Sequence, residues 1–312
     1  MPAHRVLRAA LPLALAACAA ACATRPPPAV PAHRDPGRCG SEPVFAAGGD
    51  RATLWVRNSP EYRAASETIY RAALEALAAG LADPAWTAEP TQSGASLALP
   101  PAVVMDVDQT VLDNSAPQAE MLLKGLCFDA FPRAWDEWLA RRAAPAVPGA
   151  AAFIRAARLM SDSAGRPVRI FFITNRECAP RAGNASACPQ QDDTMANLEA
   201  LGLGSGTLAD DLMLRGERPD WGAEKLPRRA AVAQGYRIVL NVGDDLADFL
   251  PGVRGASVAE RDAARCARAD YWGRQWFLLP NPMYGSWLVA LGSDLDAALA
   301  APLKVLADCP RG

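Results

Sequence analysis

Two groups of aspartates in this sequence have the type and spacing to do chemistry. Asp106 and Asp108 lie at the end of an apolar run, and Asp244 and Asp248 follow another. Side chains two apart on a strand point to the same face, so Asp106 and Asp108 can share one site. Crowded carboxylates repel one another unless a cation neutralises them. An all-oxygen ligand set suits Mg²⁺, which favours phosphate substrates, so we predict that these aspartates converge on a magnesium ion.

A hydroxyl, an amide and two cationic side chains stand at comparable positions. Thr174 ends another apolar run and is followed directly by Asn175 and Arg176. Lys225, one of three lysines against 29 arginines, lies between two further apolar runs. A lysine retained in an arginine-rich chain indicates a need for a compact point charge, and an incidental surface lysine is the alternative. Asn175 and Arg176 are candidates for substrate binding, with a structural role in the loop as an equal alternative.

These residues need a scaffold that brings the ends of distant segments together. Strands are predicted by short apolar runs at residues 102–107, 169–174, 212–214, 236–242 and 275–279. Helices are predicted by the spacing of apolar residues at 59–82, 149–160 and 194–201. Strands that alternate with helices predict an α/β fold, a doubly wound parallel sheet covered on both faces. Ligands bind such sheets beyond the carboxyl ends of the strands, where the candidate residues lie.

The composition excludes several other chemistries. With 312 residues, 51% of them hydrophobic, the chain can bury a sizeable core. Its formal net charge of −2 provides no general basic field, so we expect no nucleic-acid polymer as a partner. The two histidines, His4 and His33, both lie near the N-terminus. The body of the chain therefore cannot use a Ser-His-Asp triad, a phosphohistidine or a histidine-ligated metal.

The N-terminus has the features of an export signal. Basic residues precede an apolar run too short to span a bilayer, which predicts a signal peptide at residues 1–17. The string LAAC that ends at Cys18 resembles a bacterial lipobox, so Cys18 is the predicted lipidation site, with Cys22 as a second candidate. Residues 18–58 are predicted to form a lipidated tether rich in proline and glycine. An ordinary signal peptide with an incidental cysteine is the alternative.

Export also bears on the location of the protein and on its cysteines. We expect a lipoprotein of the bacterial cell envelope, held at the outer membrane and facing the periplasm or the exterior. Exported proteins can form disulfides. Cys178 and Cys188 flank a loop-like stretch and are predicted to be bridged, and Cys266 with Cys309 is a second predicted pair. Since no C-x-x-C motif occurs, a zinc site has little support.

Four ordered motifs resemble those of the haloacid dehalogenase (HAD) superfamily. The string DVDQT at residues 106–110 resembles its D-x-D-x-T motif, and Thr174 and Lys225 resemble its second-motif hydroxyl and third-motif base. Asp244 and Asp248 resemble its acidic fourth motif. The longer strings are similar to those of class C acid phosphatases, secreted bacterial lipoproteins that include 5′-nucleotidases; they are DVDQTVLDNS, AVPGA, FFITNR, VGDDLADF and LPNPMYGSW.

This resemblance implies a fold and an activity. It spans residues 59–292 and implies a Rossmann-like phosphatase domain at residues 59–312 with a small helical cap around residues 113–147. The implied activity is Mg²⁺-dependent hydrolysis of phosphomonoesters, with 5′-nucleotides as the implied substrates. Asp106 would attack phosphorus and form an aspartyl phosphate. Asp108 would protonate the departing alcohol and then activate the water that breaks the intermediate.

The resemblance also implies ligands for the metal and for phosphate. The implied metal ligands are Asp106, Asp244 and the backbone carbonyl of Asp108. Asp248 would fix either the metal's water or Lys225, while Thr174 and Lys225 would contact the phosphate oxygens. Three positions depart from the family pattern without removing a reactive group: Gln109, Asp245 and Leu288 stand where Glu, Asn and Glu are common.

Aromatic residues in and beyond the implied cap suggest how a substrate is selected. Phe128, Trp135 and Trp138 lie in the cap region, and Tyr284 lies in a late turn. Aromatic faces stack on nucleobases, so Phe128 and Tyr284 could sandwich a base with Trp135 nearby. The alternative is that these aromatics close the cap's own core. We expect that core role for Trp138, and both roles stay open for Trp135.

Two other function classes stay open on the sequence. A phosphotransferase or phosphomutase uses the same motifs and differs in whether water or another hydroxyl attacks the intermediate. A non-catalytic surface lipoprotein could bind nucleotides, haem or a partner on the same scaffold. The intact Asp106, Asp108, Lys225 and Asp244 favour an active enzyme. The absence of histidine from the body also removes the commonest haem ligand.

Overall fold

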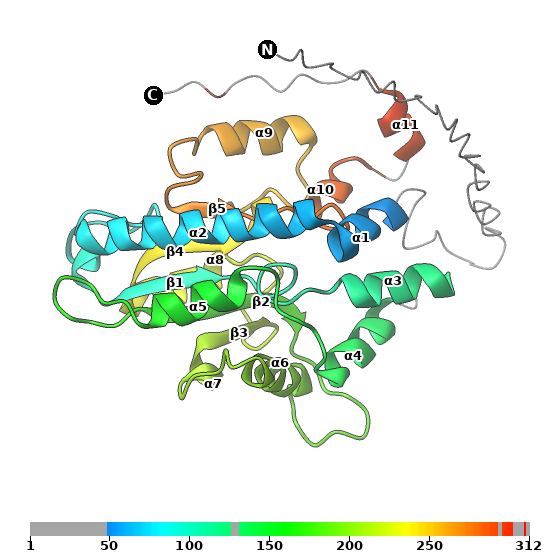
Figure 1. Cartoon of the computed structure of the whole chain (residues 1–312), viewed down its shortest axis with the longest axis horizontal. Helices are drawn as coiled ribbons and strands as arrows, with labels where there is room; N and C mark the ends of the chain where they lie inside the picture. Colours follow the sequence, from blue (N-terminus) through cyan, green and yellow to red (C-terminus); the bar gives the residue numbers. More distant parts are fainter. Residues whose placement is uncertain (1–48, 126–130, 293–294, 302–308, 310–312) are drawn as a thin grey trace, which may run out of the picture. The chain divides into compact units, whose positions relative to one another are not determined.

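A five-stranded parallel sheet forms the centre of the part of the chain that the structure describes (Figure 1). The computed structural model describes residues 49–125, 131–292, 295–301 and 309, all within the compact unit of residues 37–312. The strand order is β3-β2-β1-β4-β5. The strands are β1 (Pro101–Met105), β2 (Arg169–Glu177), β3 (Leu212–Arg215), β4 (Arg237–Gly243) and β5 (Trp276–Leu278). Each strand coincides with one of the predicted apolar runs.

Helices precede, connect and follow these strands. The longer ones are α1 (Gly49–Asn58), α2 (Pro60–Ala82), α3 (Ser115–Lys124), α4 (Phe131–Arg141), α5 (Ala150–Arg158), α6 (Pro189–Ala200), α8 (Leu226–Gly235) and α9 (Val258–Cys266). The shorter ones are α7 (Leu208–Asp211), α10 (Ser286–Val289), α11 (Leu295–Ala300) and the 3₁₀-helices η2 (Gly94–Ala98) and η4 (Leu246–Asp248). The predicted α/β fold with a parallel sheet is confirmed.

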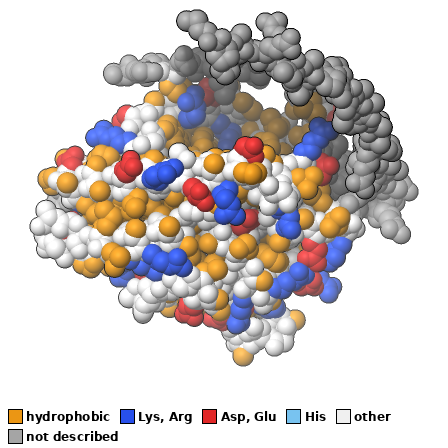
Figure 2. All heavy atoms as spheres, viewed as in Figure 1, with side chains coloured by type: hydrophobic (Ala, Val, Ile, Leu, Met, Phe, Trp, Pro, Cys, Tyr) orange, Lys and Arg blue, Asp and Glu red, His pale blue; other side chains and the backbone are white. Residues whose placement is uncertain are grey.

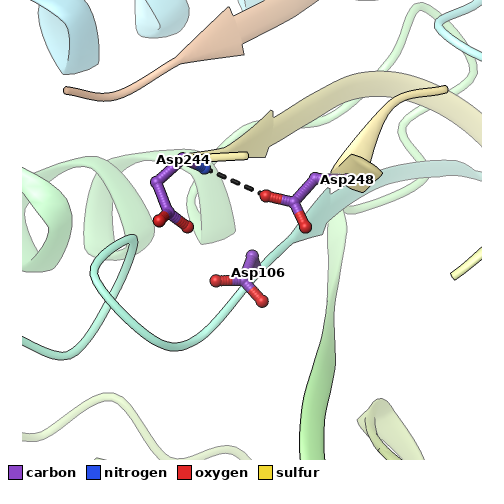
Figure 3. A group of neighbouring side chains, drawn as sticks. All are labelled: Asp106, Asp244 and Asp248. Carbon is purple, nitrogen blue, oxygen red and sulfur yellow. Dashed lines mark hydrogen bonds between the residues drawn. The ribbon is translucent and has the colours of Figure 1, made fainter. Parts of the chain in front are cut away.

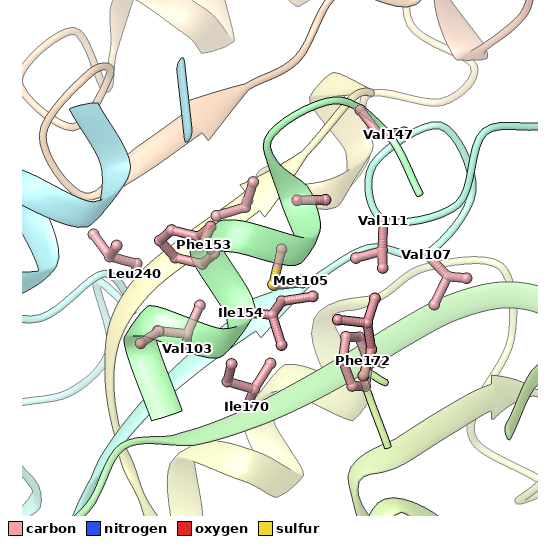
Figure 4. Close-up of a cluster of buried hydrophobic side chains, with 14 of the residues drawn as sticks. Val103, Met105, Val107, Val111, Val147, Phe153, Ile154, Ile170, Phe172 and Leu240 are labelled. Carbon is pink, nitrogen blue, oxygen red and sulfur yellow. The ribbon is translucent and has the colours of Figure 1, made fainter. Parts of the chain in front are cut away.

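The sheet is buried on both faces because side chains alternate along each strand. In β1, Val103 and Met105 join the apolar cluster that includes Phe153 of α5 (Figure 4). Ala102 and Val104 of the same strand point to the opposite face and join a second cluster. Strands buried on both faces consist almost entirely of apolar residues, which explains why these strands could be recognised in the sequence.

Helix α2 supports the loop that follows β1, residues 106–114, here called the β1 loop. The Tyr70 hydroxyl donates a hydrogen bond to the Thr110 carbonyl at 2.6 Å. The side-chain amide of Gln109 donates to the Tyr62 hydroxyl at 2.9 Å. Gln109 has a φ of 61°, a left-handed conformation that turns the loop sharply after β1. Two tyrosines of one helix therefore hold a loop whose path is unusual for a non-glycine residue.

Helix α1 occupies the last ten residues of the predicted tether. The tether interpretation is therefore wrong for residues 49–58, because Thr53 and Val56 bury one face of a helix there, and α1 packs against α3. Within the predicted cap region, residues 113–147, the structure contains α3 and α4. The chain upstream of the sheet thus contributes a folded helix next to the cap region.

Several predictions concern residues outside the described part of the chain. These are the signal peptide at residues 1–17, the rest of the tether, the lipidation candidates Cys18 and Cys22, and the cap residue Phe128. Among the helices formed by the described residues, none is both long and apolar enough to cross a bilayer.

Two disulfides join loops to helices. Cys178, just after β2, is bonded to Cys188 at the start of α6, with their Cα atoms 4.7 Å apart. Cys266 at the end of α9 is bonded to Cys309, with Cα atoms 4.9 Å apart. Both pairs are those predicted from the sequence.

The surface of the described domain carries charges of both signs. Acidic and basic side chains are interspersed with apolar ones over the face seen in Figure 2.

Candidate active site

Three aspartates meet at the carboxyl ends of β1 and β4 (Figure 3). Asp106 directly follows β1, Asp244 directly follows β4, and Asp248 ends η4. One carboxylate oxygen from each residue lies within 4.8 Å of one from each of the others. The structure thus brings together three of the four aspartates that were predicted to surround a metal ion.

Gly243, the last residue of β4, provides the space that Asp248 occupies. A Cβ atom at this position would lie 2.6 Å from the Asp248 Cβ and 2.8 Å from its Cγ, too close for any side chain. The Asp248 Oδ2 atom accepts hydrogen bonds from the backbone N–H groups of Asp244 and Asp245, both at 3.0 Å. The turn after β4 therefore folds the Asp248 carboxylate back over the end of its own strand.

Lys225 adds a buried positive charge to this cluster. It lies immediately before α8, and its Nζ atom contacts the Asp106 carboxylate and lies 2.7 Å from Asp248 Oδ1. Burial opposes the charge of the ammonium, but the carboxylates of Asp106 and Asp248 outweigh it and raise the pKa of Lys225. Lys225 is therefore held as a cation between two of the three aspartates.

The pKa values of two of the carboxylates, Asp106 and Asp244, are raised. Burial raises the pKa of Asp106 to about 6, although the Lys225 charge acts in the opposite direction. Burial likewise raises the pKa of Asp244 well above its usual range, and the charges of Asp106 and Asp248 add to the rise. Both shifts show that the protein groups around these two carboxylates do not fully compensate their negative charge.

The donor set of the cluster fits a divalent cation. The Asp244 carboxylate accepts hydrogen bonds from the Thr110 hydroxyl at 3.0 Å and the Asn281 amide at 2.8 Å, which are both neutral donors. Lys225 contacts two of the three carboxylates, those of Asp106 and Asp248, so the three aspartates and this lysine together carry two negative charges when fully ionised. Carboxylate oxygens with this net charge match a hard ion such as Mg²⁺.

Asp108 lies apart from the carboxylate cluster and has its own partners. Its carboxylate forms an ion pair with Arg176 at 2.7 Å and accepts hydrogen bonds from Asn114 at 2.7 Å and Thr174 at 3.2 Å. The expectation that Asp106 and Asp108 project from one face of a strand is wrong, because β1 ends at Met105. Both residues lie in the β1 loop, where strand alternation no longer applies.

The three residues at the end of β2 contact protein groups. The Thr174 hydroxyl donates to Asp108 and accepts from the Arg176 backbone N–H at 3.1 Å. The Arg176 side chain, only 2% exposed, is divided between Asp108 and the Thr194 hydroxyl. The Asn175 side-chain oxygen accepts from buried Arg228 at 2.8 Å. These contacts correspond to the structural alternative for Asn175 and Arg176.

The predicted aromatic residues occupy different environments. The Tyr284 ring packs against the small cluster of Val56, Tyr62 and Met283. Burial raises the pKa of Tyr284 well above its usual range, and the charges of the site aspartates add to the rise. Its backbone N–H donates to the side-chain oxygen of Asn281 at 3.4 Å, and the Asn281 amide donates to Asp244. Trp135 stacks on Phe131 of the same helix, with ring centroids 5.9 Å apart.

Trp138 is buried, as expected for a core role, but it belongs to the same apolar cluster as Val103 and Met105 of β1 rather than to a separate core of the cap. Its indole N–H donates to the Asn114 side-chain oxygen at 2.9 Å, a contact that the sequence did not predict. Sequence reasoning also missed the two side chains that donate hydrogen bonds to Asp244, those of Thr110 and Asn281. All three missed partners lie within strings that carried the family resemblance, but a string does not show which side chains touch.

Asp245 connects the cluster to the turn that carries Tyr284. Its carboxylate accepts hydrogen bonds from the backbone N–H and the hydroxyl of Ser286 and from the Ala247 N–H at 2.9 Å. These hydrogen bonds outweigh the effect of burial and lower the pKa of Asp245. The aspartate that departs from the family pattern is therefore accommodated by donors of its own.

The sheet, the β1 loop and the clustered carboxylates together define a HAD-type phosphatase. The family model described as HAD superfamily, subfamily IIIB (acid phosphatase), matches residues 61–287. The chain belongs to this family and is an acid phosphatase, a phosphomonoester hydrolase.

Two solved structures are similar to this chain. Both are of the class C acid phosphatase from Bacillus anthracis, one of them with tungstate bound. Each is 31% identical in sequence, with a TM-score of 0.61, and the match covers 80% of this chain. It covers 93% of the tungstate-bound chain and 92% of the other.

Proposed function

We propose that this acid phosphatase is Mg²⁺-dependent and that it transfers the phosphoryl group of its substrate to Asp106 before water releases phosphate. The observation that carries the proposal is the buried contact of Asp106 with Lys225, beside Asp244 and Asp248. A nucleophile next to a fixed cation and a divalent-ion site is what phosphoryl transfer requires.

The proposed metal ligands are Asp106, Asp244 and the backbone carbonyl of Asp108. A magnesium ion there would neutralise charge on the transferring phosphoryl group. The ion pair between Asp248 and Lys225 supports a role for Asp248 in fixing the lysine. Lys225 in turn stands beside the nucleophile, where its ammonium can contact a phosphoryl oxygen and stabilise the charge of the transition state.

The reaction proceeds in two displacements. In the first, an oxygen of Asp106 attacks phosphorus while the bond to the leaving oxygen breaks, and Asp108 gives a proton to that oxygen. In the second, water attacks the phosphorus of the aspartyl phosphate and gives a proton to Asp108. The bond to Asp106 then breaks and phosphate leaves. Thr174, at the end of β2, contacts the phosphoryl oxygens in both steps.

A 5′-nucleotide is the proposed substrate class. Tyr284 supports this proposal because its backbone N–H donates to Asn281, whose side-chain amide donates to the site residue Asp244. A nucleobase stacked on an aromatic ring gains about 1–3 kcal/mol. Phe128 is the proposed second wall of the base site. Trp135 is the proposed neighbour, although its stacking on Phe131 already uses one of its faces.

The decisive experiment measures phosphatase activity with and without metal. We expect activity to fall to background in EDTA and to return when Mg²⁺ is added in excess. Asp106→Asn should abolish turnover in Mg²⁺ without lowering the melting temperature, whereas Asp210→Asn, at an exposed position outside the site, should leave activity unchanged. Full activity in EDTA would refute the metal requirement, and turnover by Asp106→Asn would refute the nucleophile.

We also propose that an N-terminal lipid on Cys18 anchors the enzyme at the outer membrane. The support is the lipobox-like string before Cys18. Cells that express the full chain and are fed labelled palmitate should give a labelled enzyme, and Cys18→Ala should lose the label. Cys22→Ala is the matched control, and a label that depends on Cys22 instead would move the anchor to that residue.

A further inference from the structure

Asn114 is an N-cap residue that does not cap its helix. An asparagine at this position ordinarily accepts a hydrogen bond from a backbone N–H of the first helical turn. Asn114 precedes α3, yet its side chain makes no such bond. Instead, its Nδ2 donates to Asp108 Oδ1 at 2.7 Å, and its Oδ1 accepts from the Trp138 indole at 2.9 Å. The fully buried amide is therefore committed to a link between the cap helix α4 and Asp108.

We infer that Asn114 and Trp138 are positioning residues that orient Asp108 for proton transfer to the leaving group. This inference rests on the acid–base role given to Asp108 in the proposed function. The indole N–H can only donate, so it fixes the amide with its oxygen toward Trp138 and its NH₂ toward Asp108. A flipped amide would place two acceptors against each other and repel the carboxylate.

The two oxygens of Asp108 are not equivalent in this arrangement. Oδ1 accepts from Asn114 and from two nitrogens of Arg176, at 2.7 to 3.0 Å. Oδ2 has only longer contacts, at 3.2 Å, with Arg176 Nε and the Thr174 hydroxyl. Oδ1 is therefore the anchored oxygen, and Oδ2 is the one that carries the proton to the substrate.

Thr174 connects this orientation to substrate binding. A hydroxyl has a single proton, so it cannot donate fully to Asp108 and to a phosphoryl oxygen at once. When the Thr174 hydroxyl turns to a bound phosphoryl group, Oδ2 loses that donor while Asn114 and Arg176 keep Oδ1 in place. Substrate binding thus removes one of the two contacts of the proton-carrying oxygen and leaves the one with Arg176 Nε, without releasing the side chain.

Helix α4 is held firmly enough to act as the support. Arg181 contacts both carboxylate oxygens of Asp136 on α4, at 2.6 and 2.8 Å, and Gln190 of α6 donates to the same carboxylate at 2.9 Å. Arg181 also contacts Asp193 of α6 at 2.7 Å. The indole of Trp138 therefore comes from a helix that is fixed to the rest of the domain.

The test compares leaving groups that differ in their need for a proton. p-Nitrophenolate leaves with little protonation, whereas the alkoxide of glycerol 2-phosphate must be protonated as it leaves. We expect Trp138→Phe and Asn114→Ala to lower kcat/KM for glycerol 2-phosphate about tenfold more than for p-nitrophenyl phosphate. Asp108→Asn should show the same selectivity more strongly. A merely structural defect would lower both values equally, because kcat/KM reports the active fraction alike for both substrates.

Trp86→Phe is the matched control, because it also removes a buried indole hydrogen bond, here to the Val239 carbonyl at 2.9 Å. It should leave the ratio of the two kcat/KM values unchanged. Equal losses, or no loss, in both Trp138→Phe and Asn114→Ala would overturn the inference, provided that Asp108→Asn is selective. A non-selective Asp108→Asn would instead overturn the acid role of Asp108, and the inference with it. If either variant fails to fold, the other supplies the same ratio.

Discussion

The ammonium of Lys225 lies 2.7 Å from the carboxylate of Asp248, and both side chains are only 4% exposed. The same ammonium contacts Asp106. One cation thus joins carboxylates that come from the ends of two neighbouring strands, β1 and β4. Because both side chains are almost completely buried, solvent and salt screen this pair little.

Replacing this lysine should destabilise the protein as well as inactivate it. Lys225→Met leaves two buried carboxylates without their cation, and breaking a buried pair in this way costs about 3–5 kcal/mol of unfolding free energy. Chemical denaturation in EDTA measures this loss. Lys124→Met, which removes an exposed pair with Glu120, should cost less than about 1 kcal/mol. Equal effects of the two substitutions would contradict the buried ion pair.

Metal binding should be visible in the stability of the enzyme. A ligand that binds only the folded state at 100 times its Kd adds about 2.7 kcal/mol to the unfolding free energy. We therefore expect Mg²⁺ to raise the melting temperature measured in EDTA-treated enzyme. Asp244→Asn should abolish most of this rise, while Asp210→Asn should preserve it. A rise of equal size in both variants would place the bound ion elsewhere.

The glycine at the end of β4 should be intolerant of a single methyl group. Gly243→Ala would push the Asp248 side chain away from Lys225, since the new Cβ would lie 2.6 Å from the Asp248 Cβ. We expect overpacking to cost about 1–3 kcal/mol and phosphatase activity to fall by at least an order of magnitude. Gly235→Ala, where nothing lies within 4 Å of the added atom, serves as the control. Wild-type activity in Gly243→Ala would show that Asp248 can be displaced without consequence.

The attachment of the cap helix should depend on pH. The hydrogen bond from Arg181 holds the pKa of Asp136 below its usual 3.8. Because the folded pKa is the lower one, the pair stabilises the fold above about pH 3.8 and loses its effect as pH falls through the folded value. Asp136→Asn should therefore lower the unfolding free energy by about 1 kcal/mol at pH 7 and by progressively less as the pH falls below 3.8. Thermal unfolding across this range measures the difference, and a constant difference would contradict the ion pair.

Base stacking on Tyr284 should separate nucleotides from simpler esters. Tyr284→Ala should lower kcat/KM for AMP by the equivalent of about 1–3 kcal/mol and have a smaller effect on glycerol 2-phosphate. Tyr284→Phe keeps the ring and should retain the preference for AMP. If Tyr284→Ala lowers both substrates equally, the tyrosine does not contact a base.

The strands and the clustered aspartates could be predicted because their signals are local. A strand buried on both faces is a continuous apolar run, and the residue that follows such a run lies at the carboxyl edge of the sheet. Asp106 and Asp244 directly follow their strands and were therefore placed correctly beside each other. Lys225 could be singled out by its rarity in an arginine-rich chain.

The contacts of Asp108 could not be predicted, because they depend on the path of the β1 loop. Gln109 adopts a positive φ, which is uncommon for a residue other than glycine. The residue type at this position therefore does not predict the turn. Arg176 was considered for substrate binding because it follows Thr174 closely at the end of an apolar run. In this structure Asp108 and Thr194 occupy its guanidinium. Helix α1 was missed because its neighbours are rich in glycine and proline.

The hydrogen bonds that Tyr62 and Tyr70 make to the β1 loop set a limit on how far the chain can be shortened. Because both tyrosines belong to α2, a truncation that ends before α2 keeps both of these side chains. A protease cut between Tyr62 and Tyr70 would remove one of these two hydrogen bonds to the β1 loop while all five strands stayed intact. We expect an enzyme cleaved there to keep its sheet but to lose its phosphatase activity.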